Sequence, residues 1–318
     1  MKRGPVVWIP AVGRKVALAR IWKQSLECLG GSLLGSDVDD HCSARGDTHC
    51  FIKSPRADAV EFESWVATTV EKYQVDWIVP VRESEFTFWS GWSGSIPRLL
   101  SKPEILNSWS SKSEAARWLH ASTLPTPEIL GADELESNVG KVIIKPNRGS
   151  GSQGIEIVDV MEVIKRQEIP RDFIIQRFVK GAEYTINLYF DPGGVCQAII
   201  PHIRLAVEQG EVTFGRTVDD ADLIALGERF AIATAGRCRG PINFQVIRDD
   251  ASGIALITDI NPRFGGGYPL THAAGGRFVD WILKQYITAV EQIDFRWKAG
   301  VALDRRGALL NKPFITGS

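Results

Sequence analysis

The sequence predicts a mixed fold, with an α/β unit in the first third of the chain and an α+β region after it. Three observations carry this prediction. Between Pro5 and about Ser101, short apolar runs alternate with amphipathic helical stretches, which is the pattern of a parallel sheet with right-handed crossovers. After Val142, strand-like runs follow one another through turns that contain glycine. The length of 318 residues is enough for two or three packed units.

Strands and helices alternate in the first third. The expected strands are 6–9, 32–35 and 77–80, and the expected helices are 16–29 and 60–73. Open parallel sheets bind ligands at the carboxyl ends of their strands, where Arg14 and Glu85 lie. A substrate contact by either residue is one interpretation, and a role in a solvated turn or a helix cap is the other.

A linker helix and a connector follow. Ser111 and Glu114 have the spacing of a capping box, which predicts a helix that begins there and ends near Ala121. The stretch 122–128 contains two prolines and is expected to be a turn. Beyond it we expect strands within 142–158, 173–178, 184–218, 242–247 and 253–257, helices at 220–235 and 278–290, and a loop at 268–276.

The composition is that of an ordinary globular protein, with 44% hydrophobic residues, 24% charged residues and a net charge of −1. This near-neutral charge gives no reason to expect binding to nucleic acid or to an acidic membrane. No apolar run approaches the roughly 18 residues of a transmembrane helix. The five cysteines are odd in number and form no CxxC pair. We therefore expect neither a zinc site nor a disulfide framework, and a cytoplasmic location.

The stretch 258–267 carries the clearest chemical signal. Asp259, Asn261 and Arg263 follow an apolar run, and alternate side chains of an extended strand share one face. Carboxylate and amide oxygens suit Mg²⁺, whereas guanidinium suits phosphate oxygens. The glycines that follow let the backbone approach a ligand. A strand end with an ordinary polar turn is the alternative interpretation.

A strand, a glycine–serine loop and a second strand are expected over 142–158. Lys145 at the end of the first strand and the backbone N–H groups of the loop can enclose polyphosphate oxygens. The stretch is neither a Walker loop nor a Rossmann fingerprint, because a strand follows it instead of a helix. An ordinary hairpin with a solvated loop is the alternative. The loop residues of interest are Gly149, Ser150, Gly151, Ser152 and Gly154.

Further polar residues interrupt the later strands. In 173–186, a short linker between two strands can offer backbone groups to an adenine edge, and Glu183 can bind ribose hydroxyls. Gln245 would lie beside Asp259 if their two strands pair. Arg204 and Arg216 each present a planar fork for a phosphoryl group or a carboxylate, with a surface salt bridge as the alternative.

Taken together, these stretches resemble the ATP-grasp superfamily. The resemblance rests on the order and spacing of Lys145, the glycine loop, Glu183, Gln245 and the row Asp259, Asn261 and Arg263. It runs from about Val6 to Trp281 and is nearest to the branch of the carbamoyl phosphate synthase large subunit and PylC-like amino-acid ligases. It implies a Rossmann-like pre-ATP-grasp domain (1–105) followed by an ATP-grasp domain with a small lobe (106–183) and a large lobe (184–318).

The resemblance also implies roles for individual residues. ATP would contact Lys112, Lys145, Gly149, Ser150, Gly151, Ser152, Gly154, Gln176, Phe178, Val179 and Glu183. One or two Mg²⁺ ions, which Mn²⁺ can replace, would bind Gln245, Asp259 and Asn261. Catalysis would fall to Arg263, Arg204 and Lys145, and substrate contacts to Arg204, Arg216, Gly266, Tyr268 and His272. A satisfied buried histidine is the alternative for His272. Gln176 and Asp259 depart from the family pattern, because many members have Glu there.

The activity implied by the resemblance is that of an ATP-dependent ligase. Such an enzyme joins a small carboxylate, often of an amino acid, to an amine through an acyl phosphate, and releases ADP and phosphate. An ATP-grasp phosphotransferase and a nucleotide-binding module without turnover are the alternatives. The expected partners are two small molecules, without nucleic acid or membrane, and a homodimer is expected by analogy alone.

Overall fold

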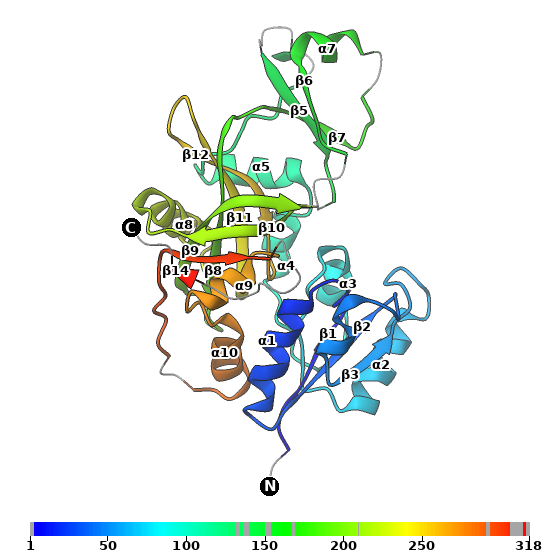
Figure 1. Ribbon diagram of the computed structural model, residues 1–318. Helices are drawn as coiled ribbons and strands as arrows, with labels where there is room; N and C mark the ends of the chain where they lie inside the picture. Colours follow the sequence, from blue (N-terminus) through cyan, green and yellow to red (C-terminus); the bar gives the residue numbers. More distant parts are fainter. Residues whose placement is uncertain are drawn as a thin grey trace.

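The computed structural model describes residues 3–131, 134–135, 140–149, 154–166, 169–208, 210–290, 293–305 and 314–315. These residues form three sheets, of four, three and seven strands (Figure 1). The seven-stranded sheet lies in the middle of the molecule, with the three-stranded sheet at one end and the four-stranded sheet at the other. The predicted combination of α/β and α+β architecture is confirmed.

The four-stranded sheet has the order β3-β2-β1-β4, and every pair in it is parallel. Its elements are β1 (Val6–Ile9), α1 (Val16–Glu27), β2 (Ser32–Asp37), β3 (Cys50–Lys53), α2 (Phe62–Tyr73) and β4 (Trp77–Ile78). The predicted parallel sheet is therefore confirmed, although β3 was not predicted and β4 is two residues shorter than expected. A short 3-10 turn η2 (Glu83–Glu85) and α3 (Phe86–Gly91) follow the carboxyl end of β4.

The linker region contains α4 (Pro103–Ser108) and α5 (Lys112–Ala121). The predicted cap of α5 is confirmed, because the Ser111 hydroxyl accepts a hydrogen bond from the Glu114 N–H at 3.3 Å. The chain then enters the three-stranded antiparallel sheet, in the order β6-β5-β7. Its elements are β5 (Lys141–Pro146), β6 (Glu156–Asp159), α7 (Val160–Lys165) and β7 (Phe173–Arg177). This sheet has an apolar core of its own.

The seven-stranded sheet has the order β12-β11-β8-β9-β10-β13-β14, with antiparallel pairs throughout. Its strands are β8 (Gly181–Phe190), β9 (Cys196–Glu208), β10 (Glu211–Thr217), β11 (Gly240–Asp249), β12 (Ala255–Asn261), β13 (Val301–Asp304) and β14 (Phe314–Ile315). The hairpin turns expected near Asp191 and near Gly210 both lie between paired strands.

The helices of this part of the chain correct two predictions. They are α8 (Ala221–Thr234), α9 (Tyr268–Ala273), α10 (Phe278–Ile282) and a π-helical turn η3 (Leu283–Ile287). The loop expected at 268–276 is wrong, because Pro269 fits the first turn of a helix and the buried Tyr268 and Leu270 hold α9 in the core. The helix expected at 278–290 is present, but it continues from α10 into the π-helical turn η3 and ends at Ile287, three residues earlier than expected.

The four-stranded and seven-stranded sheets share one apolar core. Trp22 of α1 has no exposed surface and meets Phe264 edge-on, with ring centroids 6.3 Å apart. Tyr268 and Trp281 extend the same cluster on the large-sheet side. Burial of these aromatic side chains fixes the two units against each other. As a result, the strand ends of the small parallel sheet face the end of β12.

All five cysteines are free thiols. The helices in the described part of the chain are all too short or too polar to span a membrane.

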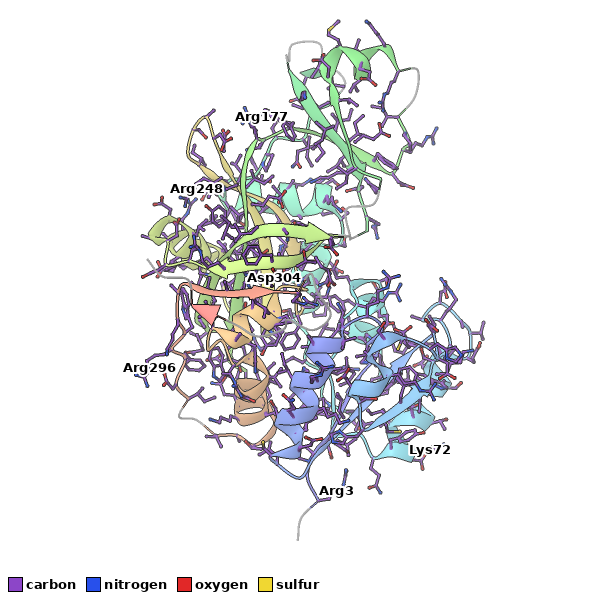
Figure 2. All side chains as sticks on the ribbon, in the orientation of Figure 1. Arg3, Lys72, Arg177, Arg248, Arg296 and Asp304 are labelled. Atoms are coloured by element: carbon purple, nitrogen blue, oxygen red, sulfur yellow. The ribbon has the colours of Figure 1, made fainter. Side chains whose placement is uncertain are left out.

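The amino end of α8 offers a test of the fold. The Asp220 carboxylate accepts from the Leu223 N–H at 3.2 Å and from Arg248 at 2.7 Å (Arg248 is labelled in Figure 2). We expect Asp220→Ala to lower the free energy of unfolding by about 1–2 kcal/mol, because it removes a helix cap and an ion-pair partner. Urea denaturation would measure this. Asp222→Ala is the control, because it also removes one negative charge but from a side chain that is 85% exposed. An equal decrease in the free energy of unfolding for Asp222→Ala would contradict the capping role of Asp220.

Candidate functional site

An inner cavity lies between the three-stranded sheet, α5 and β12. It has a volume of about 520 Å³, including its open mouth. Five of the predicted site residues line it together: Lys112, Lys145, Gly149, Gln176 and Asp259. Apolar side chains of α5 and β12, among them Leu119 and Ile257, complete the wall. The cavity therefore joins a charged surface to an apolar one.

The row at the end of β12 is continuous. Asn261 donates from Nδ2 to Asp259 Oδ2 at 3.1 Å, and Arg263 donates from Nη2 to Asn261 Oδ1 at 2.8 Å. The three side chains thus share one face, as the alternation of strand residues predicts. Gln245 lies directly opposite Asp259 in the β11–β12 pair. The strand pairing on which the prediction for Gln245 depended is present.

The donor chemistry of this row fits a hard divalent cation. Asp259 offers a carboxylate, and Asn261 and Gln245 offer amide oxygens, which are ligands that Mg²⁺ accepts beside water and phosphate oxygens. Within the described residues, no group of three or more His, Cys, Asp or Glu side chains gathers as a metal site. A cation held here by the protein would therefore take one carboxylate together with amide oxygens.

Lys145 is the buried cation of the inner cavity. Its side chain at the end of β5 leaves only 6% of the residue exposed. Burial lowers the pKa of Lys145 to about 8, against the opposing effect of Asp259. Lys112, at the start of α5, donates from Nζ to the Gly149 carbonyl oxygen at 2.9 Å. The predicted phosphate-binding lysines thus face the same cavity from two elements.

A larger outer cleft, of about 2850 Å³ with its mouth included, adjoins the inner cavity. Its walls come from the carboxyl ends of the parallel strands, from α4 and from the residues after β12. Arg14, Lys15, Asp37 and Arg82 line it on the parallel-sheet side, and Arg263 lines it on the large-sheet side. This placement agrees with the tendency of open sheets to bind ligands at strand ends.

An ion pair joins the two sides of the outer cleft. Arg263 Nη2 lies 2.9 Å from Glu83 Oε1, which comes from η2 after β4. Burial raises the pKa of Glu83, although the neighbouring Arg263 acts in the opposite direction. Burial also lowers the pKa of Lys15 to about 8, and the charge of Arg263 adds to this effect. The cleft therefore holds charged groups of both signs close together.

Arg204 and Glu183 form a second ion pair, at 3.2 Å between β9 and β8. The guanidinium of Arg204 is almost fully buried and also donates to the Gly210 carbonyl oxygen at 3.1 Å. Glu183 keeps half of its side-chain surface exposed. Neither Arg204 nor Glu183 lines the inner cavity or the outer cleft.

Arg216, Gly266, Tyr268 and His272 do not line either cavity. The Tyr268 hydroxyl accepts from the Val279 N–H at 3.1 Å and lies 3.2 Å from His272 Nδ1. Burial lowers the pKa of His272 to about 4, so it is uncharged at neutral pH. Arg216 lies on β10 between β9 and β13. Gly266 accepts a hydrogen bond at its carbonyl oxygen from Arg305 at 2.9 Å.

The predicted adenine-binding segment lies between β7 and β8. Gln176 is buried and donates from Nε2 to the Pro127 carbonyl oxygen at 2.8 Å, which orients its amide. The Phe178 N–H donates to the Lys141 carbonyl oxygen at 3.2 Å, and Val179 is buried. Gly154 precedes β6 with a positive φ of 69°. Ser150, Gly151 and Ser152 lie outside the described residues.

The cavities also contain residues that the sequence did not single out. Glu83 and Lys15 are the main ones, and Asn147 is a third, because its Oδ1 accepts from the Ser113 N–H of α5 at 2.9 Å. The sequence signal that could have identified them is their position beyond the carboxyl ends of strands: Glu83 follows β4, Lys15 follows β1 and Asn147 follows β5. Strand ends were recognised as ligand sites, but no local pattern distinguishes Glu83 from Glu85, which instead accepts from Trp89 Nε1 at 3.1 Å.

Comparison with known families places this site in context. The model of a family described as "ATP-grasp domain" matches residues 109–267, which is half of the chain. The match includes the row at the end of β12 and all the lining residues of the inner cavity except Glu83. No curated protein matches the sequence.

Solved structures match the fold along nearly all of the chain. The L-amino acid ligase of Bacillus licheniformis has a TM-score of 0.73 at 15% identity, over 95% of this chain and 79% of that one. The N5-carboxyaminoimidazole synthetase of Staphylococcus aureus with ADP has 0.74 at 14%, over 95% and 82%. The biotin carboxylase domain of the Hydrogenobacter thermophilus 2-oxoglutarate carboxylase, with MgADP, ADP and bicarbonate, has 0.73 at 13%, over 95% and 74%.

Proposed function

The chain belongs to the ATP-grasp family, and from this premise we propose that it is an ATP-dependent ligase that joins the carboxylate of a small molecule to an amine. The intermediate in this proposal is an acyl phosphate, and the products are an amide, ADP and phosphate. Similar folds in an amino-acid ligase and in a synthetase with ADP support the reaction class.

One observation carries the proposal. The inner cavity, with Lys112, Lys145 and Asp259, opens toward an outer cleft that holds Arg263 at the end of the same row. A nucleotide in the first and a second molecule in the other would meet at this row. Such an arrangement brings a phosphoryl group and its acceptor into one protected space.

The chemistry explains why these charges are needed. A carboxylate does not react with an amine at neutral pH, because oxide is a poor leaving group. Transfer of the γ-phosphoryl group of ATP to the carboxylate creates a good leaving group. The protein must then hold a polyphosphate and a carboxylate, both anionic, in contact with each other.

We assign the roles as follows. Lys145 and Lys112 bind phosphate oxygens, and Arg263 stabilises the phosphoryl group as it moves to the carboxylate. Gln245, Asp259 and Asn261 would hold Mg²⁺, which neutralises charge on the phosphates when it is bound. The remaining roles predicted for the glycine loop, for 176–183 and for Arg204 stay predictions, as do the domain boundaries after 105 and 183 and the homodimer.

Turnover with Mg²⁺, ATP and pooled amino acids tests the proposal, with ADP, AMP and new masses measured together. We expect ADP and a mass equal to two inputs minus water. Release of AMP instead of ADP would show that the reaction proceeds through an acyl adenylate and not through an acyl phosphate. ADP with a stable phosphorylated product that needs no amine would identify a phosphotransferase. Binding of ATP without any product would favour a module that only binds nucleotide.

The affinity for MgADP should depend on pH through Lys145. Its pKa of about 8 in the empty site means that the ammonium loses its proton between pH 7 and pH 9. Bound phosphate favours the charged form, so binding at pH 9 must take up a proton. We expect the dissociation constant, measured by calorimetry, to rise about tenfold over this range.

Two variants separate Lys145 from other groups. Lys145→Met should bind MgADP weakly and without this pH dependence. Lys15→Met removes the second lysine with a pKa of about 8, which lines the outer cleft and not the inner cavity. Lys15→Met should keep the pH dependence of MgADP binding. If that dependence were lost in Lys15→Met, its assignment to Lys145 would be wrong.

A further inference from the structure

Glu83 is the one described carboxylate that lines both the inner cavity and the outer cleft. It comes from η2, directly beyond the carboxyl end of β4 in the parallel sheet. Asp259, in contrast, comes from β12 of the large sheet and lines the inner cavity. Two carboxylates from different units therefore face one space, and the proposed function employs only Asp259.

Glu83 extends the row of Asp259, Asn261 and Arg263, because it forms an ion pair with Arg263. The 2.9 Å ion pair joins it to the same Nη2 atom that donates to Asn261. Under the proposed function, Arg263 holds the phosphoryl group as it reaches the substrate carboxylate. The amine must attack the acyl carbon beside that group, so it must come close to Glu83.

The surroundings of Glu83 suit a group that exchanges partners. Its side chain retains 38% of its surface, although Oε1, the atom that faces Arg263, is itself buried. The charged groups near it are Arg263, Asp259, Lys112 and Lys15. The pKa of Glu83 is raised by burial in spite of three cations in this set. A carboxylate of raised pKa is a stronger base than one in water.

We propose that Glu83 binds the amine substrate and accepts a proton from its ammonium form. This inference rests on the proposed ligase function. When Arg263 engages the phosphoryl group and the substrate carboxylate, its charge is satisfied there. Glu83 is then available for the incoming cation, which enters from the outer cleft. The parallel-sheet unit thus contributes a catalytic residue and not only a wall of the cleft.

The proton and electron balance is simple. The ammonium group gives one proton to the Glu83 carboxylate and becomes a neutral amine. The nitrogen lone pair forms the C–N bond to the acyl carbon, and the bond from that carbon to the phosphate oxygen breaks. Phosphate leaves with the electron pair and takes up the second proton lost by the nitrogen. Glu83 returns its proton to solvent.

Hydroxylamine separates this role from phosphoryl transfer, because it is largely unprotonated at neutral pH and needs no base. The assay contains MgATP and a pool of the common L-amino acids as carboxylates. The amine is hydroxylamine in one arm, and the amino acids themselves with ammonium chloride in the other. ADP, hydroxamate and amide are measured. For Glu83→Gln we expect ADP and hydroxamate within about fivefold of wild type, and amide about 100-fold lower.

Glu211→Gln is the matched control, because Glu211 also lines the outer cleft. It should leave the ratio of amide to hydroxamate unchanged, and Glu83→Asp should restore part of the amide. The inference would be overturned if Glu83→Gln lost hydroxamate formation or kept wild-type amide formation. It would also be overturned if Glu211→Gln lost amide formation while it kept hydroxamate formation. Wild type that forms hydroxamate but no amide would also overturn it, because the site would then fail to deprotonate an ammonium ion.

Failure of the proposed function has a different signature. Wild-type protein that releases no ADP and forms no hydroxamate would remove the ligase activity itself, and the role of Glu83 with it. An unchanged thermal unfolding midpoint of Glu83→Gln excludes misfolding as the cause of any loss.

Discussion

Asp259→Asn should reduce MgATP turnover about 1,000-fold, which corresponds to roughly 4 kcal/mol of transition-state stabilisation. The substitution keeps the shape of the side chain and a partner for Asn261, whose Nδ2 donates to Asp259 at 3.1 Å. It removes the carboxylate of the row, and amide oxygens alone hold a divalent cation weakly. ADP release as a function of free Mg²⁺ measures the effect.

Asp250→Asn is the control for this change, because Asp250 is an exposed carboxylate in the turn between β11 and β12. It should keep wild-type turnover. Gln245→Glu should act in the opposite direction, since it places a second carboxylate across from Asp259 and should lower the Mg²⁺ concentration needed for half-maximal turnover. Wild-type kinetics in Asp259→Asn would disprove the metal role.

Lys145→Met should lower turnover at least about 100-fold and, at the same time, make the empty protein more stable. The activity falls because the buried cation facing the phosphates is lost. The stability rises because methionine fills a similar volume without a charge. At 6% exposure, the lowering of the Lys145 pKa to about 8 corresponds to a stability gain of about 1–3 kcal/mol.

The sign of the stability effect follows from linkage. The folded pKa of Lys145 lies below the value of about 10.4 for an unfolded lysine. The unfolded chain therefore binds more protons between these values, and wild-type stability should rise from pH 8 to about pH 10. In Lys145→Met this rise should be smaller. Denaturant melts at pH 7 and pH 9.5 measure both quantities.

Lys112→Met provides the comparison, because Lys112 lines the same cavity but bonds to the Gly149 carbonyl oxygen from an exposed position. We expect a loss of turnover of about tenfold and no gain in stability. A variant Lys145→Met that is both inactive and less stable than wild type would indicate that the lysine mainly supports the fold.

Local patterns in the sequence were sufficient for much of this architecture. The apolar runs of β1, β5, β11 and β12 and the capping residue Ser111 lie where periodicity and helix-end chemistry place them. The row from Asp259 to Arg263 follows from strand alternation alone. These features depend on contacts between residues close in sequence, and such contacts leave a readable spacing.

Other features depended on the tertiary structure. Tyr268 and Leu270 form α9 and not a loop because they are buried in the core. β13 joins the large sheet through β10, a pairing between distant segments that no local spacing encodes.

By itself, the sequence determined most of the order of the elements and five of the residues that line the inner cavity, namely Lys112, Lys145, Gly149, Gln176 and Asp259. Only the tertiary structure brought Glu83 to Arg263. The reason is physical: the contact forms because Trp22 and Phe264 bury apolar surface between the two sheets. Apolar periodicity shows which face of a helix or strand is buried, but burial is non-directional and does not specify which distant segment covers that face. The pairing of the two units therefore appears only in the fold.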